Sequence, residues 1–239
     1  MPDRTPNQHI LENFEEILVQ LHADLMTLGN LVGEQLIDCK KMLQDSNDDR
    51  AVITLLESAV SREEQINHLD LKISDGLANC FAMHQPIGRD VRTCLGMVRS
   101  SLDLERIGDE SLHVAEFFAT IRQELSLPDD ITGYLLELLD LAQISVINAL
   151  NAWSSTSSKT AEQVITDDVA INEKEQGLYQ LLISRLKAQD LPIEVGVILI
   201  RAARSLERIG DHSKNLAQSA IYRLTGRDTR HPEAAPAKH

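Results

Sequence analysis

The hexapeptide Leu-Glu-Arg-Ile-Gly-Asp occurs twice in this chain, at residues 104–109 and, letter for letter, at 206–211. The match extends outward over residues 99–115 and 201–217 at a constant offset of 102 residues. The flanking residues lack turn signals and are typical of a helix, so in each copy the Glu lies one helical turn before the Asp. We interpret the repeat as an internal duplication that places the same acidic pair on one helix of each half.

The composition favours a helical fold. The chain has 239 residues, of which four are Phe, three Tyr and one Trp, whereas Leu, Ile, Ala and Val are abundant. Sandwiches and barrels favour aromatic and β-branched residues in their strands. The formal charge of −14 makes general binding to nucleic acid or to an anionic lipid surface unfavourable, because such binding depends on Lys and Arg. Cations and basic protein surfaces are the better partners.

The sequence shows no pattern of export or of membrane insertion. Cys39, Cys80 and Cys94 are widely spaced and form no Cys-x-x-Cys pair, so they predict neither a disulfide framework nor a thiolate metal site. The first residues lack the basic and apolar segments of a secretory signal, and no window reaches the roughly 18 uninterrupted apolar residues of a membrane span. We therefore expect a soluble, cytoplasmic protein.

Internal prolines and polar clusters divide the chain into six expected helices. Pro86, Pro128 and Pro192 mark junctions, because proline is tolerated at the start of a helix and not inside it. The polar clusters at 46–49 and 154–158 add two further breaks. Apolar residues recur at threes and fours between the breaks, which is the period of one buried helical stripe. The expected helices cover about 10–43, 49–83, 86–125, 130–153, 160–188 and 192–224.

The expected fold is all-α, with two tandem three-helix bundles that arose by duplication. Short connections between long amphipathic helices predict antiparallel neighbours. The repeat period of about 100 residues is too long for a solenoid unit, which has 20 to 50. We assign residues 10–127 to the first bundle and 128–225 to the second. The tail 226–239 is rich in Pro, Ala and charge, and we expect it to be disordered.

The second helix of each half carries a matching set of oxygen-bearing side chains. Both sets have spacings of four and three residues, so each lies on one helical face. Since the second and third helices of a bundle are antiparallel neighbours, this face can meet the acidic pair of the hexapeptide. Carboxylate and amide oxygens without thiolates suit a hard or borderline divalent cation. The two sets are Glu63, Asn67 and Asp70 in the first half and Asp168, Asn172 and Glu175 in the second.

The third helix offers further ligands and also alternatives to metal binding. His113 follows Asp109 by one turn and Asn215 follows Asp211, so either side chain could complete a metal shell. Alternatively, the acids form an ordinary solvated surface, with Arg106 and Arg208 neutralising them locally.

A second alternative concerns catalysis by a metal pair. Glu110 and His113 form a Glu-x-x-His pair, and di-iron carboxylate bundles need two such pairs. The equivalent positions of the second half are His212 and Asn215, which weakens the case for a carboxylate-bridged oxidase. No Gly-rich phosphate loop or other catalytic motif occurs. A metal-free helical adaptor also stays open.

The mid-helix glycines Gly108 and Gly210 need a separate reason, since glycine costs about 1 kcal/mol against alanine inside a helix. Close approach of a neighbouring helix, or room for an ion beside the backbone, would explain them.

The doubled hexapeptide on two three-helix repeats resembles the PhoU family, accessory proteins of the bacterial high-affinity phosphate transport system. The stretch Gln85-Pro86 to Asp90-Val91-Arg92 is similar to the family's entry into its third helix. The resemblance covers about residues 10–225. It implies a cytoplasmic negative regulator that is not an enzyme and that links the ATPase subunit of the phosphate ABC transporter to the sensor histidine kinase of the phosphate regulon. It also implies a homodimer.

The resemblance further implies divalent metal ions, such as Mg, Mn, Zn or Fe, on paired acidic motifs. Asn67 and Asn172 occupy places where metal-binding family members often have Asp, so each face loses one negative charge. We therefore expect fewer ions or weaker binding than in those members. The candidate metal ligands are Glu63, Asn67, Glu105 and Asp109 on the first face and Asp168, Asn172, Glu207 and Asp211 on the second.

Overall fold

A computed structural model describes residues 6–44, 49–124 and 127–230 of the chain. All regular elements within these ranges are α-helices, which confirms the all-α prediction. The helix ends agree with those expected to within a few residues, except that the first helix begins at Pro6 and not near residue 10. In order they are α1 (Pro6–Gln44), α2 (Asp49–His84), α3 (Arg89–Glu124), α4 (Asp129–Ser154), α5 (Lys159–Ala188) and α6 (Ile193–Thr225).

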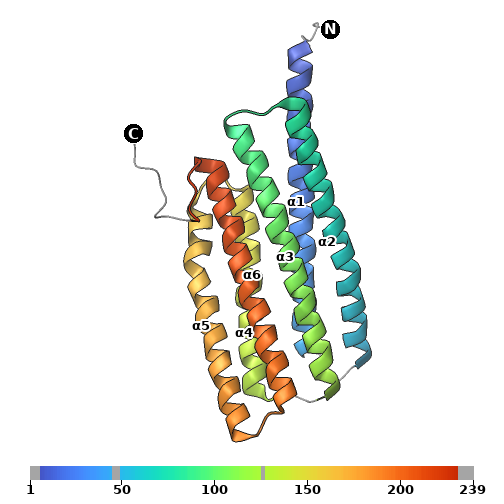
Figure 1. Cartoon of the computed structure of the whole chain (residues 1–239), viewed down its shortest axis with the longest axis vertical. Coiled ribbons are helices and arrows are strands. Elements are labelled where there is room, and N and C mark those ends of the chain that lie inside the picture. Colours follow the sequence, from blue (N-terminus) through green and yellow to red (C-terminus); the bar gives the residue numbers. More distant parts are fainter. Residues whose placement is uncertain (1–5, 45–48, 125–126, 231–239) are drawn as a thin grey trace.

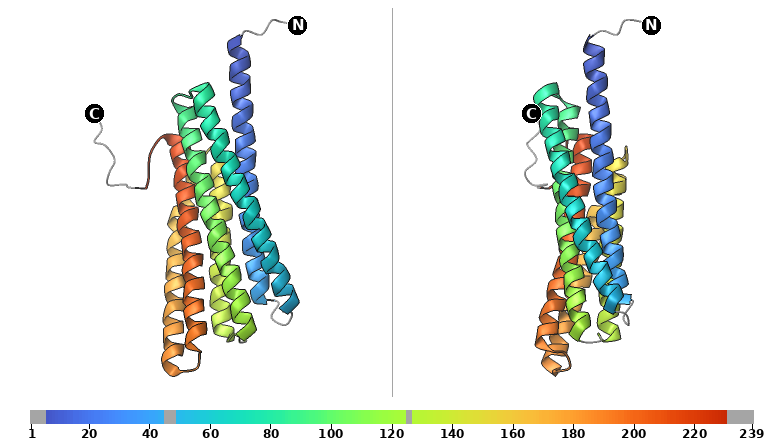
Figure 2. Two further views of the ribbon diagram at one scale, coloured as in Figure 1. Left: turned by 45° about the vertical axis from the view of Figure 1, so that its right-hand side comes forward. Right: turned by 90° about the vertical axis from the view of Figure 1, so that its right-hand side faces the viewer.

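The six helices form two three-helix bundles that lie side by side, as predicted (Figure 1). Helices α1, α2 and α3 pack against one another, and so do α4, α5 and α6. The bundles meet along α3 and α6, the two helices that carry the hexapeptides, and along α1 and α4. The rotated views of Figure 2 show that the helices run roughly along one long axis. The two copies of the repeat therefore line the junction between the halves.

Each helix buries the apolar stripe that its sequence period predicts. In α1 the side chains of Leu21, Leu25, Leu28, Val32 and Leu36 are buried at spacings of three and four residues. Full burial of each such side chain contributes about 1.5–3 kcal/mol to folding. Because helices of this kind gain most of their stability from packing, the stripe decides which face of each helix turns inward.

The predicted proline junctions are confirmed. Pro128 and Pro192 occupy the N-cap positions of α4 and α6, and Pro86 lies in the connection before α3. Proline has no amide hydrogen to donate, so this start position loses no helical hydrogen bond. At the other end of α6 the chain turns at Gly226, whose φ of 77° favours glycine.

Helix α4 is long and apolar enough, by length and composition, to cross a membrane. In the structure its apolar face instead packs inside the second bundle, with Ile131, Leu135, Leu138 and Trp153 among its buried residues. Core helices of water-soluble proteins pass the same test of length and composition. The helix therefore fills the core of the bundle in which it lies.

Part of the segment expected to be disordered lies against the helices. After α6, Asp228 contacts Arg99 of α3, with 3.9 Å between the carboxylate and the guanidinium. The backbone of Gly226 lies beside the side chain of Arg92, also in α3. The described tail, residues 226–230, thus packs against the first half. Residues 231–239 lie outside the described ranges.

Candidate metal-binding faces

The second and third helices of each half pack tightly against each other at the glycine of the hexapeptide. A Cβ atom built on Gly108 would lie 3.1 Å from Oε2 of Glu63 and 3.1 Å from the side chain of Ile66. In the second half, a Cβ on Gly210 would lie 2.8 Å from Ile171 and 3.5 Å from Oδ1 of Asp168. The prediction of close helix approach is confirmed. The absence of a side chain at this glycine leaves space for a carboxylate from the facing helix.

Glu63 is the most unusual acid of the first face. The residue is 7% exposed, and neither carboxylate oxygen has a hydrogen-bond partner among the described residues. Burial, and after it the negative charge of Asp109, raises the pKa of Glu63 to about 7. The carboxyl groups of Glu63 and Asp109 can share a hydrogen bond only if one of them is protonated, because two ionised carboxylates offer no donor. At neutral pH the side chain therefore holds either a proton or an uncompensated charge.

Glu105 adds a third carboxylate to this face. Its pKa is raised by partial burial and then by the charges of Asp109 and Asp70, while Arg106 and His212 lower it. Asp70 itself accepts a hydrogen bond of 2.6 Å from Ser101, so it serves to join α2 to α3. The repulsion among Glu63, Glu105 and Asp109 is what a bound divalent cation would relieve.

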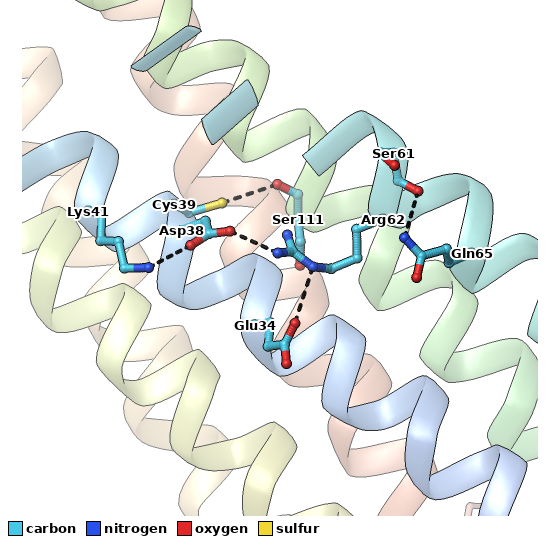
Figure 3. A network of polar contacts seen from close by, with 8 residues as sticks. All are labelled: Glu34, Asp38, Cys39, Lys41, Ser61, Arg62, Gln65 and Ser111. Carbon is cyan, nitrogen blue, oxygen red and sulfur yellow. Dashed lines mark hydrogen bonds and ion pairs between the residues drawn. The ribbon is translucent and has the colours of Figure 1, made fainter. Parts of the chain in front are cut away.

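Contacts from α1 hold this region in place (Figure 3). Arg62, next to Glu63, donates to Asp38 over 3.0 Å and lies 3.6 Å from Glu34, which joins α2 to α1. The thiol of Cys39 donates to the backbone carbonyl of Ser111 in α3. These contacts, drawn together in Figure 3, come from all three helices of the first bundle. They join both α2 and α3 to α1.

A further contact lies beside the glycine itself. The side-chain amide of Gln35 in α1 donates to the carbonyl of Gly108 over 3.0 Å. Gln35 is fully buried, so this bond anchors α3 at the point where Glu63 reaches it. Its interaction with Glu63 lowers the pKa of that carboxyl only slightly compared with the raising effect of burial.

The second face contains the equivalent acids but also two cations. Asp168 is 2% exposed, and its Oδ2 accepts a bond of 2.6 Å from Nζ of Lys214 in α6. The pKa of Glu207 is raised by burial and by Asp211, and it is lowered by Arg204, which lies 3.1 Å away. The two faces therefore share their acids and differ in charge compensation.

The structure places the other candidate ligands at the surface. Asn67, Asn172, Asp109 and Asp211 are exposed. No group of three or more His, Cys, Asp or Glu side chains in the described ranges already stands as a metal-ligand set. On the first face the buried, unpartnered oxygens of Glu63 and the neighbouring carboxylates suit a hard divalent cation in type, and the side chains at the surface would have to turn inward to bind it.

His113 and Asn215, the two candidates for completing a metal shell, contact residues outside the acidic faces. Asn215 donates to Asp103 of α3 over 3.3 Å, a contact across the junction between the bundles. His113 lies 3.7 Å from Glu110 and stacks on Phe117. Both side chains make other contacts in this structure, and their role as metal ligands stays a prediction.

The arginine pairing was also different from the local one expected. Glu110 pairs with Arg208 of α6, with 2.7 Å between the groups, and not with Arg106 one turn away. Asp103 pairs with His212 of the same partner helix over 3.0 Å. These ion pairs across the junction went unnoticed in the sequence, because a periodic pattern within one helix gives no information on a helix in the other half.

The sequence model of the PhoU domain matches residues 25–118 and 135–220, one match in each bundle. The chain belongs to the PhoU family. The match covers more than half of the chain and follows the two repeats that the hexapeptides mark.

Two relatives illustrate the breadth of the PhoU family. A phosphate-specific transport system accessory protein PhoU homolog from a Burkholderia species is 29% identical over 94% of this chain and 94% of its own length. The PhoU protein of Escherichia coli is 24% identical over 94% of this chain and 90% of its own length. Both alignments span both bundles, so the similarity is to the whole duplicated unit.

Solved structures agree with the fold. The crystal structure of PhoU from Pseudomonas aeruginosa superposes with a TM-score of 0.83 at 28% identity, over 90% of this chain and 100% of that one. The PhoU protein from Streptococcus pneumoniae, described as a phosphate transport system regulatory protein, superposes with a TM-score of 0.80 at 23% identity. At that identity the second comparison supports the fold alone.

Proposed function

We propose that this chain is a regulatory accessory protein of a bacterial phosphate transport system. The observation that supports this most is full-length similarity to relatives that carry this description, with both bundles aligned. In this proposal the protein is cytoplasmic and acts between the ATPase subunit of the phosphate ABC transporter and the sensor histidine kinase of the phosphate regulon. It reduces signalling when phosphate is plentiful.

The charge of the chain supports a role as an adaptor. A formal charge of −14 favours docking to basic surfaces of partner proteins and disfavours nucleic acid. We propose that the adaptor works as a homodimer and catalyses no reaction. Sedimentation of the purified chain tests the dimer, because a monomer at micromolar concentration would contradict it.

Deletion of the gene tests the regulatory role. We expect phosphate-starvation genes to be expressed even in phosphate-rich medium, and re-expression of the intact chain to restore repression. Normal repression in the deletion strain would contradict the role. Pull-down from phosphate-replete cells tests the partners, since the transporter ATPase and the kinase are both expected among the captured proteins.

We also propose that a divalent metal ion binds to the first acidic face. Support comes from Glu63, a buried carboxylate with two unpartnered oxygens beside Glu105 and Asp109. Burying an unpaired carboxylate is costly, and a cation between α2 and α3 would remove that cost. The metal would thereby stiffen the contact between the two helices.

A metal titration with a matched control tests this site. Addition of Mn²⁺ to the chelator-treated protein is expected to raise the melting temperature, since a ligand that binds only the folded state stabilises it. Glu63→Gln is expected to abolish the effect. Glu64→Gln removes the same charge from the neighbouring exposed residue, and we expect it to respond like the wild type. An unaltered response in Glu63→Gln would refute the site.

The alternative of a carboxylate-bridged oxidase is less well supported. Its Glu-x-x-His pair uses Glu110, which is 6% exposed and already paired with Arg208. A ferrous-iron assay separates the two readings, because an oxidase consumes oxygen as it oxidises iron and an adaptor does not.

A further inference from the structure

The buried carboxylate of the second face already has a cation of its own. Lys214 reaches from α6 to Asp168 in α5, and its ammonium lies 2.6 Å from Oδ2. Asp168 is 2% exposed, whereas Lys214 keeps a third of its side chain in solvent. A lysine ammonium is a compact point charge, and in this position it compensates the charge of the buried carboxylate. The other oxygen of Asp168, Oδ1, has no hydrogen-bond partner in the part of the chain that the structure describes.

The first face has no such lysine. At the offset of 102 residues that relates the two repeats, the position of Lys214 corresponds to Leu112. An isobutyl side chain cannot compensate a charge, and within the described ranges both oxygens of Glu63 lack a hydrogen-bond partner. The same carboxylate position is therefore compensated within the chain in one half and left uncompensated in the other.

A second pair of equivalent positions shows the same contrast. Arg204 lies 3.1 Å from Glu207 on the second face, and its equivalent on the first is Leu102. Leu102 lies one turn before Glu105 and offers no charge. The second face thus carries two extra positive charges at positions where the first carries leucine. At both positions the second face gains a positive charge relative to the first, although the acids of the two faces repeat.

We propose that Lys214 acts as a built-in cation that takes the place of a metal ion, so that the chain binds divalent metal on its first face and not on its second. A metal ion at Asp168 would have to displace a close ion pair and then lie beside a free ammonium and Arg204, both of which repel it. The residue at this position, Leu112 or Lys214, decides whether the face binds metal. The inference rests on the proposed metal site of the first face.

The test moves this single residue between the halves. The full-length chain and its variants are treated with chelator, and Mn²⁺ bound at saturation is measured by equilibrium dialysis. Lys214→Leu gives the second face the residue of the first, and we expect it to double the amount bound. Leu112→Lys gives the first face the residue of the second, and we expect it to remove binding. Lys187→Leu removes the same charge at an exposed position of α5 and serves as the control.

Two further variants locate the bound metal. Asp168→Asn is expected to leave the amount bound by the wild type unchanged and to cancel the gain of Lys214→Leu. In the Lys214→Leu background, Glu63→Gln is expected to remove the metal of the first face, so that only the metal of the second face stays bound. Circular dichroism of each variant shows that it is folded, and Lys214→Gln provides a second uncharged side chain if Lys214→Leu does not fold.

The outcomes separate the two proposals. If Asp168→Asn halves the binding of the wild type, or if neither Lys214→Leu nor Lys214→Gln binds more metal than the control, the role of Lys214 is refuted. If the wild type binds no metal but Lys214→Leu does, the first face is refuted and the role of Lys214 is upheld. If none of the variants binds metal, both proposals fail.

Discussion

Glu63→Gln is expected to stabilise the metal-free protein at neutral pH. The substitution keeps the shape of the side chain and removes a charge that the fold does not compensate. The pKa of Glu63 is about 7 in the folded chain against an ordinary value of 4.5, so between these pH values the folded state binds more protons than the unfolded state. Stability from this group is complete below pH 4.5 and is lost as the pH rises through 7.

The size of the effect follows from the difference between the two pKa values. Each pKa unit corresponds to about 1.4 kcal/mol, which gives an upper limit of about 3 kcal/mol at pH 8. The exposed carboxylate of Asp109 is screened by solvent, and this lowers the expected gain to roughly 1–2 kcal/mol. The new amide can also donate to Asp109, which an ionised Glu63 cannot do.

Urea unfolding of chelator-treated protein at pH 5 and pH 8 measures this gain. We expect Glu63→Gln to match the wild type at pH 5 and to be more stable at pH 8, whereas Glu64→Gln, at an exposed position, stays close to the wild type at both. With saturating Mn²⁺ the order at pH 8 is expected to reverse, because only the wild type gains binding energy. Equal or lower stability of Glu63→Gln at pH 8 without metal would refute the reasoning.

Three further substitutions test the packing around the candidate site, each by urea unfolding. Gly108→Ala is expected to cost about 1–3 kcal/mol of stability, because the new Cβ would lie 3.1 Å from the side chain of Ile66 in α2. The control Gly33→Ala has open space around its Cβ and is expected to gain roughly 0.5–1 kcal/mol. Equal effects of the two substitutions would contradict the close approach of α2 and α3. Asp103→Ala is expected to cost about 1–3 kcal/mol, because His212 and Asn215 of α6 lose the carboxylate that they contact. No loss would show that the junction between the bundles does not depend on this acid. Arg62→Ala is expected to cost about 1–2 kcal/mol, since it leaves the buried carboxylate of Asp38 with one cation fewer; an unchanged midpoint would show that the pair of Arg62 and Asp38 does not stabilise the fold.

Much of the architecture could be predicted from local patterns. The apolar period, the three internal prolines and the doubled hexapeptide were enough for six helices in two bundles, because amphipathicity and the lack of an amide hydrogen in proline act within a few residues. Gly108 and Gly210 pointed to close helix approach for a similar reason, since a glycine inside a helix needs compensation by packing. The spacings of four and three residues that follow both Glu63 and Asp168 indicated that these acids occupy equivalent positions on the second helix of each half. In the structure these helices do pack closely against the third helices.

The charge compensation of these acids could not be predicted in the same way. The contact of Lys214 with Asp168 joins residues 46 apart in the sequence, and the pair of Glu110 with Arg208 joins the two bundles. Such pairs depend on how one helix is rotated against another. That rotation is set by all side chains packed between the helices, and no single pattern within one helix specifies it.

The sequence by itself therefore determined that the chain is a helical duplication with the same acids twice, because repetition and periodicity are properties of the chain. Only the tertiary structure decided that Glu63 is buried without a partner while Asp168 is paired with an ammonium, because both burial and ion pairing depend on distances between helices.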